Sequence, residues 1–410
     1  MKIGLLAFHS ACNFGATLQL LSTYMYLKQH GHVPVIINWS ALDLEAYYGS
    51  HVPQAQLDNQ LQVRKQLWEE TSLCRTTEDV AHVIEGCGIE AVIIGSDAVA
   101  QHHPWLERLV FPCRTVIGLR GTMTSTQYPN PFWATWLPLL SHSIPVAAMS
   151  VSNQDSSYRL IPPGERKAMG NSILSYSYAS VRDEWTQKMF VHLTKGKLTP
   201  PVTPDPVFAF TQNASSILPS IAQIRERFHL PERYLLLSFL PTARPSVTQE
   251  WIDEFSRIAA DDGLTCVMLP FSHGDSFGTL PHTISLPLSP VDWFSLIIHS
   301  QGYVGNNMHP IVVSLANQIP FFSFDTYGTP RLNGLYVNQS SSKILHLLQT
   351  AGFADHRVSC TARRFTPPSP DVVYGQLKAF DRNGCQAFAD RFLSLYNQMM
   401  TDILNSFANG

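Results

Sequence analysis

Short, almost wholly apolar runs alternate with amphipathic stretches along most of this chain, and no other feature restricts its fold as much. The runs occupy residues 3–8, 33–38, 90–94, 145–149 and 176–181, then 234–239, 265–269, 283–286, 302–304 and 320–324. Strands that are apolar along their whole length are typical of a parallel sheet covered by helices on both faces. The sequence therefore predicts an α/β protein with two Rossmann-like domains, whose strand ends face a central cleft.

A change in composition separates the two series of runs. Residues 195–205 are rich in Pro, Thr and Lys and precede the point where the pattern starts again. We predict an N-terminal α/β domain over residues 1–210, a second over 211–350, and a helical tail over 351–410 that ends in a long amphipathic helix. A chain of 410 residues is long enough for two cores.

Charge and cysteine content exclude several classes of protein. The net charge is −3 without a basic stripe, which argues against a nucleic-acid partner. The seven cysteines form no C-x-x-C pair, and neither a carboxylate nor a cysteine near His102 and His103 completes a metal-binding set. The first apolar run is too short for a signal peptide or a membrane span. We expect a reduced, cytoplasmic protein without a metal.

Polar residues collect where the predicted strands end. They are Asn13 in the turn after the first run, Ser96 and Asp97 after the third, Arg182 after the fifth, and Asn306, Asn307 and His309 near the end of the second series. The carboxyl ends of parallel strands build the ligand sites of such sheets. Each residue also has a plainer explanation, as a helix cap for Asn13, Asp97 or His309 and as a surface ion pair for Arg182.

The chemistry of these residues favours an anionic ligand over a dinucleotide. The first turn lacks G-x-G-x-x-G, so only Gly15 would let a backbone approach a pyrophosphate. Pro310 places His309 at a helix N-terminus, where free N–H groups and the helix dipole attract anions. A bound anion there would keep the imidazole protonated, as a general acid requires. The guanidinium of Arg182 suits a carboxylate or a phosphate.

Two further segments are weaker candidates. Arg244 follows the first strand of the second series, in a loop that suits phosphate or simply meets solvent. Asn130, Trp133 and their neighbours form an aromatic, proline-containing loop that could stack on a sugar ring or pack in a core.

Taken together, these segments resemble the polysaccharide pyruvyl transferase family. The matching motifs are Phe8 to Gln19, Gly95-Ser96-Asp97, Ser180 to Glu184, Asp205-Pro206-Val207 and the segment around His309. They occur in the family's order over residues 1 to 325. Relatives commonly follow Gly-Ser-Asp with Gln and, two residues later, Trp, where this chain has Ala98-Val99-Ala100, and some carry Arg at the position of Asn307.

The resemblance implies a GT-B-like fold and a transferase that uses phosphoenolpyruvate as co-substrate, without a metal or another cofactor. His309 and Asp97 would be catalytic. Arg182, Arg244, Asn306 and Asn307 would bind the donor, and Asn13, Ser96, Asn130 and Trp133 would bind the acceptor. The acceptor would be a sugar or a lipid-linked glycan of a cell-surface polysaccharide, and a lipid-linked acceptor would bring the protein to a membrane surface.

Two alternatives remain open from the sequence. A nucleotide-sugar glycosyltransferase of the same architecture would need an acidic residue on the ribose, for which Asp292 and Asp325 are candidates. A non-catalytic, glycan-binding relative is favoured by the substitutions at residues 98–100 and by Asn307.

Overall fold

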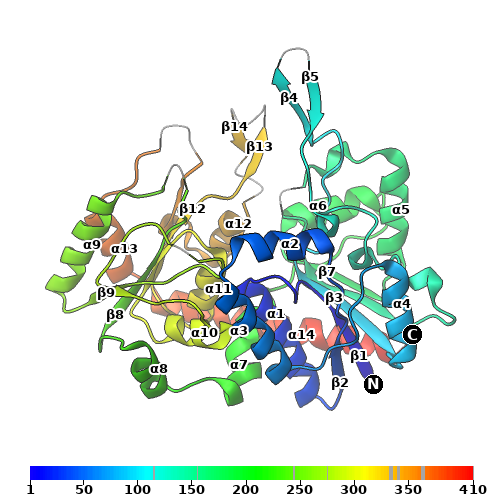
Figure 1. Cartoon of the computed structure of the whole chain (residues 1–410), viewed down its shortest axis with the longest axis horizontal. Helices are drawn as coiled ribbons and strands as arrows, with labels where there is room; N and C mark the ends of the chain where they lie inside the picture. The colour runs from blue at the N-terminus through cyan, green and yellow to red at the C-terminus, as the bar shows by residue number, and fades with distance from the viewer. Residues whose placement is uncertain are drawn as a thin grey trace.

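Two parallel β-sheets, one from each half of the chain, form the framework of the protein (Figure 1). The structure is a computed structural model that describes residues 1–113, 116–154, 156–242, 245–274, 276–331, 336–338, 342–361 and 365–409. Both sheets have the doubly wound arrangement that the apolar runs predict. The predicted α/β class with two Rossmann-like domains is confirmed.

The first sheet has the strand order β2-β1-β3-β6-β7. Its strands are β2 (Val33–Ile36), β1 (Lys2–Leu6), β3 (Ala91–Asp97), β6 (Val146–Val151) and β7 (Tyr178–Val181). Successive residues of these strands enter two different cores, which explains why the strands are apolar throughout. One face packs against α1 (Phe14–Gln29) and α14 (Arg382–Ala408), and the other against α4 (Thr77–Gly86), α5 (Pro163–Leu174) and α6 (Glu184–Leu193).

The second sheet has the order β10-β9-β8-β11-β12-β15. Its strands are β10 (His282–Thr283), β9 (Thr265–Met268), β8 (Tyr234–Ser238), β11 (Tyr303–Gly305), β12 (Phe321–Asp325) and β15 (Arg357–Ser359). Helices α9 (Gln249–Asp261) and α13 (Pro370–Lys378) cover one face, and α10 (Pro290–Ile298) and α11 (Met308–Ala316) cover the other. The edge strand β15 lies within the segment that we expected to be helical.

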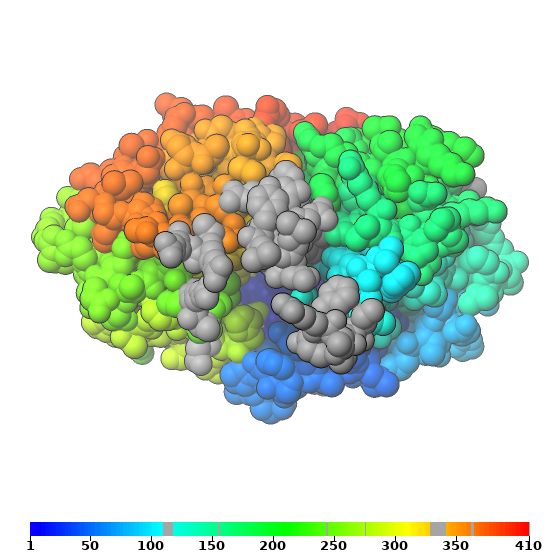
Figure 2. All heavy atoms as spheres, turned by 90° about the horizontal axis from the view of Figure 1, so that it is seen from above, coloured from blue at the N-terminus to red at the C-terminus, as the bar shows by residue number. Residues whose placement is uncertain are grey.

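Helices α1 and α14 join the two domains. The ring of Phe14 in α1 lies 5.5 Å from that of Trp293 in α10. Helix α14 begins beside α11, where the thiol of Cys385 contacts the carbonyl of Leu315, and it ends on the first domain, where Ser406 meets Ser177. Figure 2 shows the two lobes side by side, with the last helix along their far edge. One apolar core therefore runs through both domains.

Several smaller elements surround the mouth of the cleft between the domains. They include α2 (Leu42–His51), α3 (Gln54–Leu67), α12 (Lys343–Ala351) and the hairpin of β4 (Leu109–Cys113) and β5 (Val116–Leu119), which projects from the molecule in Figure 1. A second hairpin consists of β13 (Thr329–Arg331) and β14 (Tyr336–Asn338). Across the residues described, no helix combines the length and the apolar character that a bilayer span requires.

Candidate active site

A cavity of about 310 Å³ lies between the carboxyl ends of the first sheet and the helices of the second domain. Its walls include Asn13, Asp97, Asn307 and His309, four residues that the strand-end pattern places at one site. Asn13 is the N-cap of α1 and accepts from the N–H groups of Gly15 (3.0 Å) and Ala16 (3.3 Å). The predicted convergence of the two domains on one cavity therefore occurs in the structure.

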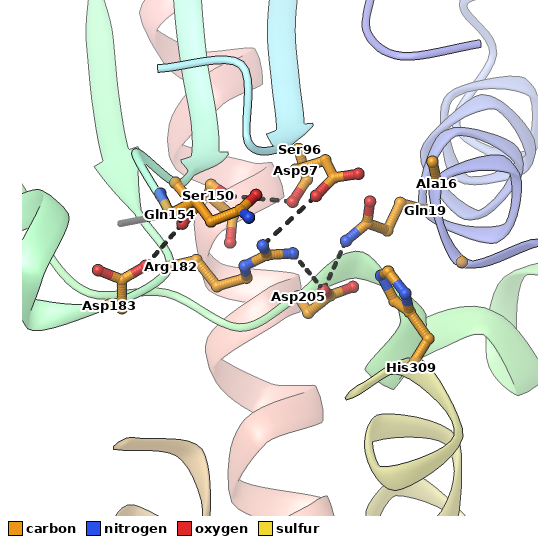
Figure 3. A network of polar contacts seen from close by, with 12 residues as sticks. Ala16, Gln19, Ser96, Asp97, Ser150, Gln154, Arg182, Asp183, Asp205 and His309 are labelled. Atoms are coloured by element: carbon orange, nitrogen blue, oxygen red, sulfur yellow. Dashed lines mark hydrogen bonds and ion pairs between the residues drawn. The ribbon is translucent and has the colours of Figure 1, made fainter. Parts of the chain in front are cut away.

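Arg182 is buried at the end of β7 and holds two carboxylates (Figure 3). Its Nη1 lies 2.8 Å from Oδ2 of Asp205, and its Nη2 lies 3.5 Å from Oδ1 of Asp97. Only 5% of the side chain is exposed, so this is not the surface pair with Asp183 or Glu184 that the sequence allowed. Its Nε has no partner among the described residues. The guanidinium is thus buried beside Asp97 of the cavity wall, with its Nε unused.

Asp97 ends β3 in a conformation that few side chains adopt, with φ at +79°. Asp tolerates this region better than most residues, and strained backbone of this kind often occurs at functional sites. Burial alone would raise the pKa of this carboxyl, but the charges of Arg182 and Lys343 outweigh it and lower the pKa. Asp97 is therefore an ionised group on the cavity wall.

His309 occupies the first turn of α11 and is 5% exposed. Asn307 caps that helix and accepts from the N–H of His309 at 3.4 Å. Burial is the main cause that lowers the pKa of His309 to about 4, while the carboxylates of Asp205 and Asp97 oppose the shift. The Nε2 atom has no partner in the described chain. His309 is thus a neutral imidazole whose Nε2 is unpartnered among the described residues.

Gly15 explains how His309 reaches this position. A Cβ built on Gly15 would lie 2.0 Å from Cγ of His309, so the imidazole rests directly on the first turn of α1. The glycine of the first motif therefore admits a side chain from the other domain rather than a pyrophosphate.

Two participants, Lys343 and Asp205, are absent from the strand-end pattern. Lys343, the first residue of α12, lines the cavity and lies 4.9 Å from the ring of Tyr327. Burial lowers the pKa of Lys343, as does the charge of Arg182. Asp205, which the sequence marks only as part of a boundary motif, pairs with Arg182 and accepts from Nε2 of Gln19 at 2.6 Å (Figure 3).

Helix N-termini give the cavity a strong preference for anions. Asn13, Asn307 and Lys343 mark the starts of α1, α11 and α12, and all three line the cavity. The dipoles of these helices add to the charge of Lys343 and oppose that of Asp97, while the caps Asn13 and Asn307 already accept from some of the first N–H groups. A compact, multiply charged anion fits this environment.

Other predicted site residues lie away from the cavity. Asn306 is buried, accepts from the N–H of Leu240 and donates to Ser246 and the carbonyl of Phe324. Ser96 donates to the carbonyl of Ser150. These bonds leave Asn306 and Ser96 engaged with the protein itself, so we assign them structural positions.

The aromatic loop is also part of a core. Asn130 caps a short 3-10 helix, Pro131–Trp133, and donates to the carbonyls of Ser125 and Gln127. Trp133 is 1% exposed within the core of the first domain. Phe8, Tyr48 and Tyr327 line the cavity instead. Arg244 lies outside the described residues.

The acidic residues that a ribose would need are engaged elsewhere. Asp325 is fully buried and accepts from Ser342 (2.6 Å) and Arg357 (2.6 Å), while Asp292 pairs with Arg227. Neither residue lines the cavity.

A second cavity, of about 360 Å³, adjoins the first. Lys343 belongs to both, and Arg182 and Asp205 form part of the second. Its remaining walls come from residues 183–208 and from α11, α12 and α14, and they are mostly apolar. The cluster of Arg182, Asp205 and Lys343 therefore separates two hollows of the interdomain cleft.

Comparisons with solved structures confirm the architecture. UDP-GlcNAc 2-epimerase from Neisseria meningitidis bound to UDP-GlcNAc superposes with a TM-score of 0.56 at 9% identity, over 99% of this chain and 100% of the other. The epimerase from Methanocaldococcus jannaschii gives 0.50 at 10% identity, with 96% and 99% covered. Arabidopsis thaliana UGT89C1 complexed with UDP-L-rhamnose gives 0.50 at 8% identity, with 100% and 98% covered. These proteins share the GT-B fold, and at such identities the likeness concerns the fold alone.

Sequence comparisons identify the family. No curated protein matches the chain. The model of the polysaccharide pyruvyl transferase family matches residues 13–327, a range that holds the capping turn at Asn13, the Asp97–Arg182–Asp205 cluster and His309. The predicted resemblance is confirmed, and this GT-B protein belongs to the polysaccharide pyruvyl transferase family.

Proposed function

We propose that the protein transfers the pyruvyl group of phosphoenolpyruvate to hydroxyls of a sugar in a cell-surface polysaccharide or its precursor and forms a pyruvate ketal. The observation that carries this proposal is the unpartnered Nε2 of buried His309, in a cavity that also receives Lys343 and three helix N-termini. Such a site attracts an anion with two charged groups and offers a proton donor beside it. Phosphoenolpyruvate, with a phosphate and a carboxylate, has this form.

The donor would be held by charge and by backbone N–H groups. The helix starts at Asn13 and Asn307 and the ammonium of Lys343 face the cavity, and they would bind the phosphate or the carboxylate. Arg182 contacts Asp205 and Asp97 through its two terminal nitrogens, Nη1 and Nη2, and its Nε is unused among the described residues. The positive charge of Arg182 would attract the anionic donor through space, or its Nε would donate a hydrogen bond to the donor.

His309 would act as the general acid. The negative charge of a bound donor raises the pKa of a neighbouring imidazole, so His309 would take up a proton as the donor binds. That proton would pass to the methylene carbon of the donor, which becomes a methyl group and leaves an oxocarbenium-like centre. A sugar hydroxyl would attack the oxocarbenium-like carbon, which still bears the phosphate. The phosphate would then leave with the electrons of its C–O bond, and a second sugar hydroxyl would attack the same carbon and close the ketal.

Asp97 would orient the acceptor hydroxyl and take its proton. Its carboxyl stays ionised beside Arg182 and lines the same cavity as His309. Phe8, Tyr48 and Tyr327 offer ring faces for the sugar. Groups that are placed before the reaction begins supply most of the rate enhancement in a site of this kind.

Phosphoenolpyruvate binding by calorimetry tests the donor without knowledge of the acceptor. We expect saturable binding by the wild type and binding weakened roughly tenfold or more by Lys343→Met, because a charge-assisted contact is lost. Arg182→Ala should abolish binding, provided that thermal unfolding shows the variant to be folded. Lys378→Met, at an exposed ion pair of α13, is the matched control and should bind like the wild type. Saturable binding of UDP or GDP in place of phosphoenolpyruvate would refute the proposal.

A further inference from the structure

A third cavity, of about 430 Å³, lies at the base of the β4–β5 hairpin. Arg108 and Arg120 line it, together with His103, Glu107, Met123 and Thr126. Met123 and Thr126 also line the candidate active-site cavity, so the two spaces share a wall. The hairpin cavity is therefore next to the candidate active-site cavity, and residues of the first domain line it.

The two arginines stand directly opposite each other across the hairpin. The N–H of Arg120 donates to the carbonyl of Arg108 at 2.8 Å, and the next pair in the register is Leu109 with Leu119. Like charges at opposed positions destabilise a pair of strands. An anion bound between the two guanidinium groups would replace their mutual repulsion with attraction to the anion.

No protein carboxylate neutralises this arginine pair in the described chain. Among the described residues, the side chain of Arg108 donates to the neutral amide of Gln127, at 3.3 Å, and its buried Nε has no partner. Glu107 lines the same cavity, but its two oxygens accept from His103 (3.2 Å) and from the N–H of Ser157 (3.0 Å). Glu107 forms no ion pair with either arginine among the described residues, so both guanidinium groups can bind an anion.

We propose that Arg108 and Arg120 bind an oxyanion, a phosphate or a carboxylate, carried by the acceptor glycan. This inference rests on the proposed function, since it places the rest of the acceptor beside the donor site. Guanidinium groups bind such oxyanions with paired hydrogen bonds. Trp105, Leu106 and Leu119 around the hairpin are 50%, 41% and 54% exposed. They offer apolar contacts to a lipid chain if the phosphate belongs to a lipid-linked acceptor.

The test uses inorganic pyrophosphate as the probe and the full chain saturated with phosphoenolpyruvate. Calorimetry should show saturable pyrophosphate binding by the wild type, weakened roughly tenfold by Arg108→Ala and by Arg120→Ala. Arg159→Ala, an exposed arginine outside this cavity, is the control and should bind like the wild type. Phosphoenolpyruvate affinity should be the same in all four proteins.

Vesicle flotation distinguishes a lipid source of the oxyanion from a soluble one. Binding to phosphatidylcholine vesicles that contain phosphatidic acid, lost in both arginine variants, would assign the site to a lipid phosphate, even without pyrophosphate binding. Pyrophosphate binding without vesicle binding would assign it to a soluble or sugar-borne anion. Wild-type behaviour of both variants in both assays, or no binding of either probe, would overturn the inference. A different result would refute the proposed function, namely that the wild type does not bind phosphoenolpyruvate.

Discussion

The position of the His309 imidazole depends on Gly15 of the first domain, because glycine has no side chain. His309 lies against Gly15 so closely that even a methyl group there would overlap its ring. Cores and interfaces are densely packed, and an overlap of this size forces the backbone or the ring to move. The two motifs are therefore a single unit, although they lie far apart in the sequence.

Gly15→Ala should displace His309 and weaken phosphoenolpyruvate binding, at a cost of roughly 2 kcal/mol in the free energy of unfolding. Calorimetry and urea denaturation measure the two effects. Gly49→Ala is the matched control, because a Cβ on this exposed residue of α2 meets nothing within 4 Å. It should leave binding unchanged and keep or slightly raise stability. Equal behaviour of the two variants would show that the ring does not need Gly15.

The sequence predicts those cavity-lining residues that come directly after a strand. It does not predict the cavity-lining residues that lie in other parts of the chain. Asn13, Asp97, Asn307 and His309 end or follow apolar runs, and the sheet brings them to one cavity. Lys343 follows no strand of either sheet directly, so no local pattern marks it. Asn130, Ser96 and Asn306 had suitable chemistry, but their hydrogen bonds to the protein are long-range or backbone contacts that a single sequence does not reveal.

Helices and strands are held in place at the cleft by buried polar side chains. Asn306, after β11, joins the ends of β8 and β12 through Leu240, Ser246 and Phe324. Such a residue fixes the loop from which α11 starts. The role of Asn306 is therefore structural.

Asn306→Ala should lower the free energy of unfolding by about 2 kcal/mol, because a buried N–H and a buried carbonyl lose their partner. Asn397→Ala, on the exposed side of α14, should change it by less than about 0.5 kcal/mol. Urea denaturation of the two variants makes the comparison. A neutral result for Asn306→Ala would show that its hydrogen bonds do not hold the ends of β8 and β12 together.

The strands that the sequence predicts are largely buried, apart from the two exposed residues of the edge strand β10. Ten runs correspond to ten strands, with ends that differ by a few residues. The sequence does not predict the hairpin strands β4, β5, β13 and β14 or the edge strand β15, since they are short and lie outside the central sheets or at an edge. Periodicity reports burial, and β15 is only partly buried along its length.

For the whole molecule, α14 determines whether the two domains unfold together. Its Tyr396 is fully buried and accepts from Asn213 at 3.1 Å, and Met399 nearby meets Ser180 of β7. The apolar core that includes this helix contains strands of both sheets. Separate domains of this size often unfold independently, whereas a shared core couples them.

Differential scanning calorimetry should therefore show one unfolding transition for the wild type. Tyr396→Ala removes a large buried side chain and should destabilise the protein by about 3–5 kcal/mol while the transition stays single. Two separate transitions, of which only one moves in Tyr396→Ala, would show that α14 belongs to one domain only.

If the cavity binds phosphoenolpyruvate as proposed, binding also protonates His309. Calorimetric titration at pH 6 in buffers of different ionisation enthalpy measures the protons taken up. The free imidazole, with a pKa of about 4, is neutral at that pH, so a donor that raises its pKa must draw in a proton. We predict that the wild type takes up close to one proton more than His309→Gln, and that its affinity falls as the pH rises. Binding with equal proton uptake in the two proteins, or no binding by the wild type, would contradict the account.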